Sequence, residues 1–282
     1  MTQGAKDSGI GWHLEFARSW AYRSDEDGVE MTAELVALAI IGLVVLAAAL
    51  QRLTGVGFAM MMAPFLVVMI GPHGGVMLTA LLSVVAPLLV MPLVWKDIEW
   101  RRLAILAPVA VLVMPFFGWL AEITPQGPLY IVVAVLVILG LSASLIVSRI
   151  DTVANGTITQ SLTGLGVGGG VILAGVGGPA MTIYAVLSRW EIRSFAATMQ
   201  PLWALMSIGG FLTKLTFSGN AVPTFPWWFW VGSLVAILLG IGVATLVRMW
   251  IDDRLARRIV IILAFVGAGL SLFMGIRQTM GL

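Results

Sequence analysis

Two glycine-rich breaks in an apolar chain are the positions best suited to chemistry. Gly55-Val56-Gly57 and Gly175-Val176-Gly177 carry the same three letters, and each precedes a short apolar run that contains a proline. A helix that begins after such a break presents free backbone N–H groups, which attract anions, and glycine lets an oxyanion approach them closely. Close helix packing through small residues is the competing interpretation of the second break. The breaks predict a backbone site for an anion, built from Gly55, Gly57, Gly175, Gly177, Gly178 and Pro179.

Polar side chains near the breaks provide a second set of substrate-binding candidates. Gln51, Arg52 and Thr54 flank the first break, and the guanidinium of Arg52 offers forked donors that match an oxyanion. An equally good interpretation is that Arg52 extends to the cytoplasmic membrane interface. Gln200 lies inside an apolar stretch close to Trp203, and polar groups inside a membrane often mark a transport pathway. All five residues are therefore candidates for the same anion site.

The other titratable groups offer no obvious catalytic or metal site. Cysteine is absent and only His13 and His73 provide imidazole, so we expect no metal and no cofactor. His73, in an expected outer turn, fits a solvated histidine better than a proton sensor. Lys214 fits an interfacial anchor, and Glu122 lies at an expected helix end, so proton coupling has no visible residue. Neither histidine falls in an expected membrane helix, and the chain is therefore not expected to be an enzyme.

The composition indicates that a membrane positions these residues. Of the 282 residues, 60% are hydrophobic and 11% are charged, and the mean hydropathy is +1.02. Soluble domains are about 45–50% apolar and about 25% charged. A stretch such as 133–147 is apolar on all sides, which favours helices over a barrel of alternating polarity. The expected partners are the lipid bilayer and a small anionic solute, and the net charge of +2 does not favour nucleic acid.

Apolar runs bounded by glycine, proline or charge predict an all-α polytopic membrane protein with eight to ten helical segments. Crossing a hydrocarbon core takes about 20 residues, and two of the runs are shorter, which makes them arms of broken or re-entrant hairpins. Residues 1–30 lack an apolar stretch and are interpreted as a mobile tail. The expected segments are 33–50, 56–70, 76–95, 103–121, 129–148, 157–173, 176–188, 194–214, 226–248 and 259–276.

Alternating these segments across the bilayer gives an orientation. It places 11 of the 16 Lys and Arg residues on one side, which the positive-inside rule assigns to the cytoplasm. The N-terminal tail and the C-terminus would then lie outside. The expected location is the inner (plasma) membrane of a bacterium.

The order of the segments predicts two copies of one unit. The membrane repeats 31–150 and 151–282 each contain an apolar run, a G-V-G break, a short run with Pro64 or Pro179, and three long helices. Five segments per unit is an odd number, so the two repeats would be inverted relative to each other, as in many carriers. The breaks would then meet near the middle of the membrane, where non-helical backbone survives only if protein or water covers it.

The motifs around the two breaks resemble those of a known family. TGVGF followed by Pro64, and GLGVGGGVILAGVGGPAM containing Pro179, are similar to the paired glycine-rich hairpins of the TauE/SafE family, also called the 4-toluene sulfonate uptake permease (TSUP) family. The resemblance covers roughly residues 33–277, although Phe58-Ala59-Met60 after Gly57 depart from the usual G-I-G-G-G. It implies carriers of sulfur-containing anions such as sulfite, sulfoacetate, sulfonates or related carboxylates.

These features predict a secondary transporter that moves a small sulfur-containing organic or inorganic anion by alternating access. An anion channel or a structural membrane subunit that transports nothing is the alternative, because broken hairpins do not distinguish these classes. A homodimer is one assembly that the sequence leaves open.

Overall fold

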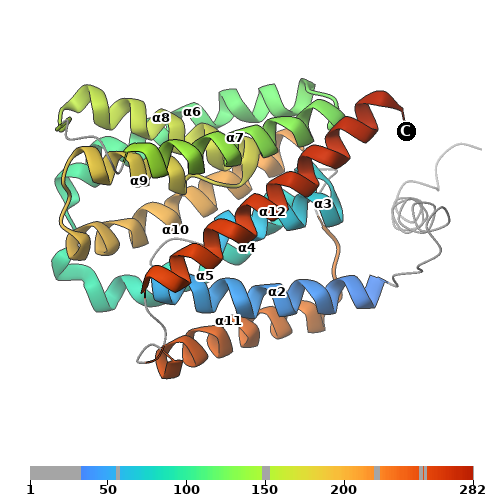
Figure 1. Ribbon diagram of the computed structural model, residues 1–282, viewed down its shortest axis with the longest axis horizontal. Helices are drawn as coiled ribbons and strands as arrows, with labels where there is room; N and C mark the ends of the chain where they lie inside the picture. The colour runs from blue at the N-terminus through green and yellow to red at the C-terminus, as the bar shows by residue number, and fades with distance from the viewer. Residues whose placement is uncertain are drawn as a thin grey trace, which may run out of the picture.

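The fold consists of helices over the part of the chain that the computed structural model describes (Figure 1). These residues are 33–54, 58–147, 153–218, 223–247, 250 and 253–281, and they contain no strand, which confirms the all-α class. The predicted tail, 1–30, lies outside them. The helices are α2 (Ala33–Thr54), α3 (Phe58–Ile70), α4 (Pro72–Ser83), α5 (Val85–Val90), the 3-10 helix η1 (Met91–Asp97), α6 (Trp100–Ile123), α7 (Gln126–Val147), α8 (Thr157–Ala174), α9 (Gly178–Leu187), α10 (Ile192–Phe217), α11 (Trp227–Val247) and α12 (Asp253–Met280).

Eight helical stretches in the described part of the chain are long and apolar enough to cross a membrane. α4, α5 and η1 together form one of them. α3 and α9 are shorter, with 13 and 10 residues. At 1.5 Å per residue they are about 20 Å and about 15 Å long, less than a hydrocarbon core of about 30 Å. The prediction of two short segments among long ones is confirmed.

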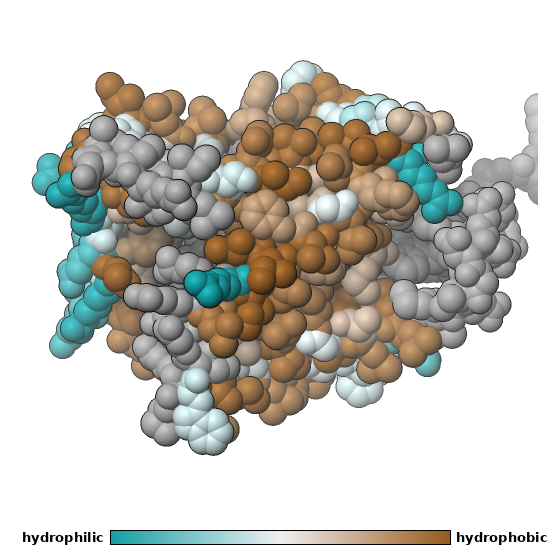
Figure 2. Space-filling view, viewed as in Figure 1, coloured by the Kyte–Doolittle hydropathy of each residue, from teal (hydrophilic) through white to brown (hydrophobic). Residues whose placement is uncertain are grey.

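Apolar side chains cover the sides of the helix bundle, as contact with lipid requires. Leu112, Leu246 and Phe273 are 77%, 76% and 64% exposed, and soluble proteins rarely expose large continuous apolar surfaces. Figure 2 shows apolar side chains across the middle of one face and hydrophilic ones at its left end. The chain is therefore a multi-pass membrane protein.

The turns between helices divide between two ends of the bundle. The turns from η1 to α6 and from α9 to α10 lie at one end, which we call the basic end because it carries Lys96, Arg101, Arg189 and Arg193. The opposite end holds the turn from α6 to α7 and the end of α10. The start of α2 and the end of α12 lie toward this end as well, on the right of Figure 1. Because the first and the last described helices have these ends on the same side, the chain passes between the two ends of the bundle an even number of times.

The helix expected at 76–95 begins earlier and is divided into three. Gly71 has a φ of 85° and Pro72 follows in the first turn of α4, so the helix already begins there. Pro87 has no N–H and cannot donate to the carbonyl of Ser83, four residues before it. α4 ends at Ser83 and α5 begins at Val85. Ser83 and Pro87, on either side of the interruption, belong to the wall of a pocket inside the bundle.

Small residues allow the long helices to approach closely. α2 packs along α11, α6 along α8, and α7 along α12. A Cβ atom on Gly240 of α11 would overlap the carbonyl oxygen of Val45 in α2, and one on Gly168 of α8 would overlap that of Ala110 in α6. Because lipid tails are as apolar as leucine, this kind of close packing holds membrane helices together.

We predict that Gly240→Ala lowers the stability of the protein by about 1–3 kcal/mol, because the added methyl group overpacks the contact between α2 and α11. Gly242→Ala on the same helix is the matched control, since nothing lies within 4 Å of a Cβ atom there. Thermal unfolding of the purified protein in detergent measures both variants. Equal melting temperatures for the two would contradict the close packing of these helices.

Candidate functional site

The second hairpin consists of α8 and the shorter helix α9, joined by a short non-helical turn. α8 ends at Ala174, and Gly175, which caps it, has a left-handed φ of 69° that suits glycine. α9 begins at Gly178 with Pro179 in its first turn. The N–H of Ala154 donates to the carbonyl of Leu187 at 2.9 Å, so the outer ends of both arms meet at the basic end. α9 is only about 15 Å long, about half of a hydrocarbon core of about 30 Å.

The second hairpin tip packs against the first hairpin. A Cβ atom on Gly175 would lie 2.7 Å from the Cβ of Ala63 in α3. Val176 belongs to a buried cluster with Met60 and Ala63. α3 is about 20 Å long and ends at the opposite end with Ile70. The first residues of α3 and α9 therefore meet deep inside the protein, covered by neighbouring helices as non-helical backbone in a membrane requires.

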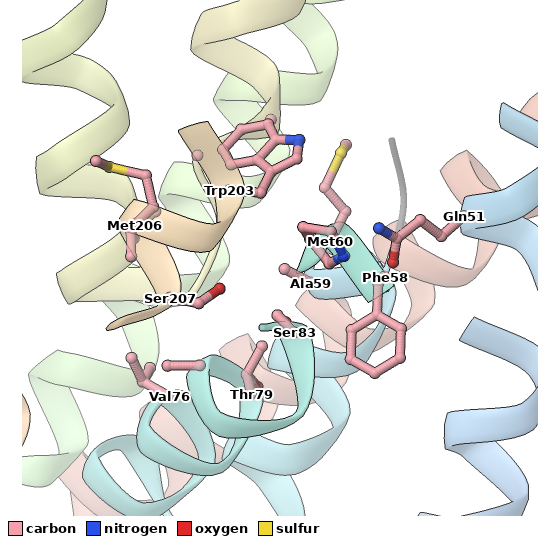
Figure 3. Close-up of a pocket in the computed structure, with 16 residues that line it drawn as sticks. Gln51, Phe58, Ala59, Met60, Val76, Thr79, Ser83, Trp203, Met206 and Ser207 are labelled. Carbon is pink, nitrogen blue, oxygen red and sulfur yellow. The ribbon is translucent and has the colours of Figure 1, made fainter. Parts of the chain in front are cut away.

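A pocket lies where these segments meet (Figure 3). Its cavity volume is about 50 Å³, enough for several water molecules. The two hairpins and two longer stretches, α4–α5 and α10, contribute its wall. The lining residues are Gln51, Phe58, Ala59, Met60, Val76, Thr79, Ala80, Ser83, Pro87, Val171, Gly175, Gly177, Gly178, Trp203, Met206 and Ser207.

Among the described residues, the pocket lining contains polar groups but no charged side chain. Gln51 Oε1 and Ser83 Oγ are buried and have no hydrogen-bond partner among the described residues. Across the cavity, Trp203 and Ser207 of α10 face Gln51 of α2, as Figure 3 shows. The amide of Gln51 can present either its oxygen or its NH₂ group, since rotation by half a turn exchanges them. Buried polar atoms without partners are uncommon, so these groups are available to a ligand.

The structure brings some of the predicted site residues together at this pocket. Gln51, Gly175, Gly177, Gly178 and Trp203 line it. Gly55 and Gly57 lie outside the described residues, as does the side chain of Thr54.

The remaining candidates do not line the pocket. Arg52 is exposed in the last turn of α2. Pro179 is buried beside Gly140 of α7, and the Nε2 of Gln200 donates to the carbonyl of Ala196 in its own helix at 3.0 Å. The sequence did not identify Ser83, Thr79 or Ser207, because a hydroxyl in an apolar helix usually bonds its own helix carbonyl.

A cluster of polar side chains joins α4, α6 and the end of α10 between the pocket and the opposite end of the bundle. Lys214 of α10 is only 1% exposed, and its Nζ lies 3.4 Å from Nδ1 of His73. Ser218 Oγ lies 3.1 Å from the same Nδ1 and donates to Glu122 Oε2 at 2.6 Å. The interpretation of Lys214 as an interfacial anchor is therefore wrong, and His73 lies half-buried in the first turn of α4 rather than in a turn between helices. We call His73, Glu122, Lys214 and Ser218 the opposite-end cluster.

A second polar cluster joins helices at the basic end. Glu99 Oε1 accepts hydrogen bonds from Trp190 Nε1 and from Ser194 Oγ, the latter at 2.8 Å. Arg193 Nε pairs with Asp97 Oδ2 at 3.0 Å. These contacts tie the end of η1 to the beginning of α10. We call Asp97, Glu99, Trp190, Arg193 and Ser194 the basic-end cluster.

Eight helical stretches long and apolar enough to cross a membrane, two shorter helices and a pocket beside the first residues of both shorter helices define, in the described part of the chain, a multi-pass helical membrane protein with a cavity in its bundle. The family model described as sulfite exporter TauE/SafE matches residues 40–271, which is most of the chain. The chain therefore belongs to the TauE/SafE family of membrane transporters. No curated protein and no solved structure gives a significant match.

We predict that Gly175→Ala destabilises the tip of the second hairpin. The left-handed φ costs a residue with a Cβ about 1–2 kcal/mol, and the new methyl group would press on Ala63. Gly156→Ala at the start of α8 is the control, because its φ is −122° and nothing lies within 4 Å of a Cβ there. Limited proteolysis and thermal unfolding in detergent compare the two. A Gly175→Ala protein as stable as the control would rule out the tight contact with α3.

Proposed function

We propose that the protein is a secondary transporter of a small sulfur-containing anion, which binds in the pocket between the hairpin tips and crosses by alternating access. The observation that carries the proposal is a cavity inside the helix bundle whose wall contains the first residues of α9, Gly177 and Gly178, together with the buried, unpartnered polar atoms of Gln51 and Ser83. Amides at a helix start favour an anion. Membership of the TauE/SafE family supports a sulfur-containing one.

The composition of the wall supports a solute with an anionic head and a short apolar part. Gly177 is closely surrounded at the start of α9: a Cβ there would lie 3.0 Å from Val167 and Val171 and 3.1 Å from the ring of Trp203. Phe58, Met60 and Met206 supply the apolar side of the same cavity. A small organosulfonate or sulfoacetate matches both sides, and sulfite matches the polar side alone. Amides and hydroxyls that donate to an anion form the stronger, charge-assisted kind of hydrogen bond.

Matching helix contacts support the two inverted repeats, 31–150 and 151–282. In the two repeats, α2, α3, the α4–η1 stretch, α6 and α7 would correspond in order to α8, α9, α10, α11 and α12. The helix pairs α2–α11, α3–α12 and α2–α12 then correspond to α8–α6, α9–α7 and α8–α7. All six pairs are in contact. Two glycine contacts correspond as well. A Cβ on Gly140 of α7 would lie 2.7 Å from Pro179 of α9, and one on Gly267 of α12 would lie 2.8 Å from Pro64 of α3. Carriers commonly place their binding site at such a repeat interface.

The two polar clusters support alternating access. Each ties the α4–η1 stretch to α10, one toward each end of the bundle, and the pocket lies between them. Solute would reach the pocket from one side when the cluster on that side opens while the other stays closed. The positive-inside rule assigns the basic end to the cytoplasm, in keeping with the inner membrane of a bacterium.

We predict that Gln51→Leu raises the half-saturation concentration for labelled isethionate, an organosulfonate, by about tenfold or more. The reason is the loss of one hydrogen bond to a charged group, which contributes about 1.5–3 kcal/mol. Counterflow in vesicles containing the purified protein measures the effect. Gln126→Leu, at an exposed position in the first turn of α7, is the control. Unchanged affinity in Gln51→Leu would remove this residue from the site, and conductance without saturation would indicate a channel.

A cysteine in the pocket tests alternating access directly, because the natural chain contains no cysteine. In a Ser83→Cys protein, we expect Glu99→Ala to increase labelling by an impermeant thiol reagent from the basic end only, because it breaks the basic-end cluster. We expect Glu122→Ala to increase labelling from the opposite end only. Isethionate should protect the cysteine in both cases. Equal access from both ends in one variant would contradict alternating access and support a continuous pore.

A further inference from the structure

Three titratable side chains from three helices meet in the opposite-end cluster. His73 belongs to α4, Glu122 to α6 and Lys214 to α10. Lys214 is almost completely buried, and the contact with His73 is the one that its Nζ makes among the described residues. A buried ionisable group in a membrane helix is costly and usually has a functional role. Solute binding in the pocket does not use any of these groups.

The geometry of the cluster admits two positions for one proton. In the first, the Lys214 ammonium donates to an unprotonated Nδ1 of His73. In the second, Nδ1 carries the proton and donates to Ser218 Oγ, which donates in turn to Glu122 Oε2, while Lys214 is a neutral amine. A further proton taken from water would give an ammonium and an imidazolium side by side. These like charges repel each other, so the contact between α4 and α10 would open.

Few other charged groups lie close enough to offset the positive charge that the cluster gains with this proton. α4 packs against α3, α5, α7, α8 and α10, and α10 packs against α4, α5, α6, α8 and η1. α3, α5, α7 and α8 contain no charged residue. The other charged groups on α6 and η1 are Lys96, Asp97, Arg101 and Arg102, and Arg193 is the other charge on α10; all of them lie at the basic end. Among the described residues of these helices, Glu122 is the single acid that faces His73 and Lys214.

The cluster is mechanically linked to the pocket. His73 lies six residues before the lining residue Thr79 on α4, and Lys214 lies seven residues after the lining residue Ser207 on α10. These spacings correspond to about 9 Å and about 10 Å along the helices. A positive charge gained at that distance inside a protein attracts an anion in the pocket by an amount equivalent to about tenfold in affinity.

We infer that the opposite-end cluster is a proton-binding site that couples solute movement to a proton. A proton bound by His73, Lys214 and Glu122 loosens the contact between α4 and α10, opens the pocket toward the opposite end and strengthens anion binding. The proton and the anion then cross together. This inference rests on the transport function proposed above.

The experiment uses vesicles that contain the purified protein and the trapped pH dye pyranine, with isethionate as the solute. An imposed isethionate gradient should move protons in the same direction as the anion, and an imposed pH gradient should accumulate labelled isethionate. Lowering the pH on the side of the opposite end should raise the apparent affinity about tenfold. Lys214→Met and His73→Asn should lose proton movement and accumulation, while exchange of solute for solute persists. Thr216→Val, at an exposed position on the same helix, is the matched control and should keep both.

The outcomes separate this inference from the function on which it rests. Solute exchange in the natural protein without any response to a pH gradient would overturn proton coupling and leave the transporter intact. Full proton coupling in both variants would assign it to other residues and also overturn the inference. The absence of solute exchange in the natural protein would overturn the transport function and the inference together. If neither variant folds, the lack of a response of the natural protein to the pH gradient still overturns the inference.

Discussion

The whole arrangement depends on one constraint: backbone polar groups that leave a helix inside the hydrocarbon must be covered by protein or by water. The second hairpin leaves helical geometry between Gly175 and Gly178, inside the helix bundle. α3 and α4 cover one side of this break, through Ala63 and Thr79 among others. Another side of the break faces the cavity, which has room for water. Covering the break therefore creates an internal site that an uninterrupted helix would not have.

The absence of charge from the pocket lining has consequences for a carrier. A fixed arginine or lysine would hold an anion through a full charge, and a buried ion pair is expensive to separate. Amides, hydroxyls and the Trp203 ring nitrogen carry only partial charges, so they discriminate by geometry and still permit release. The buried charges toward the two ends of the bundle, such as Lys214, are free to respond to conformation or to protons. Recognition and coupling would then be carried out by different groups on the same pair of helices.

The sequence predicted the helices well because each apolar run that crosses lipid must be about 20 residues long. The breaks also singled out Gly175, Gly177 and Gly178, which line the pocket; that they bind the anion stays a prediction. The interruption after Ser83 could not be predicted, because proline is tolerated inside other membrane helices here, such as α6 and α10. The opposite-end cluster was missed for another reason. His73 and Lys214 are 141 positions apart, and nothing local in either segment indicates that they meet.

The most direct measurement is a density map of the protein in lipid nanodiscs, recorded with and without saturating isethionate. The account predicts solute density inside the membrane, between Trp203 and Gln51, with its sulfonate oxygens near the first amides of α9. Solute density only at the membrane surfaces, or a pocket filled by side chains in both maps, would contradict the central claim.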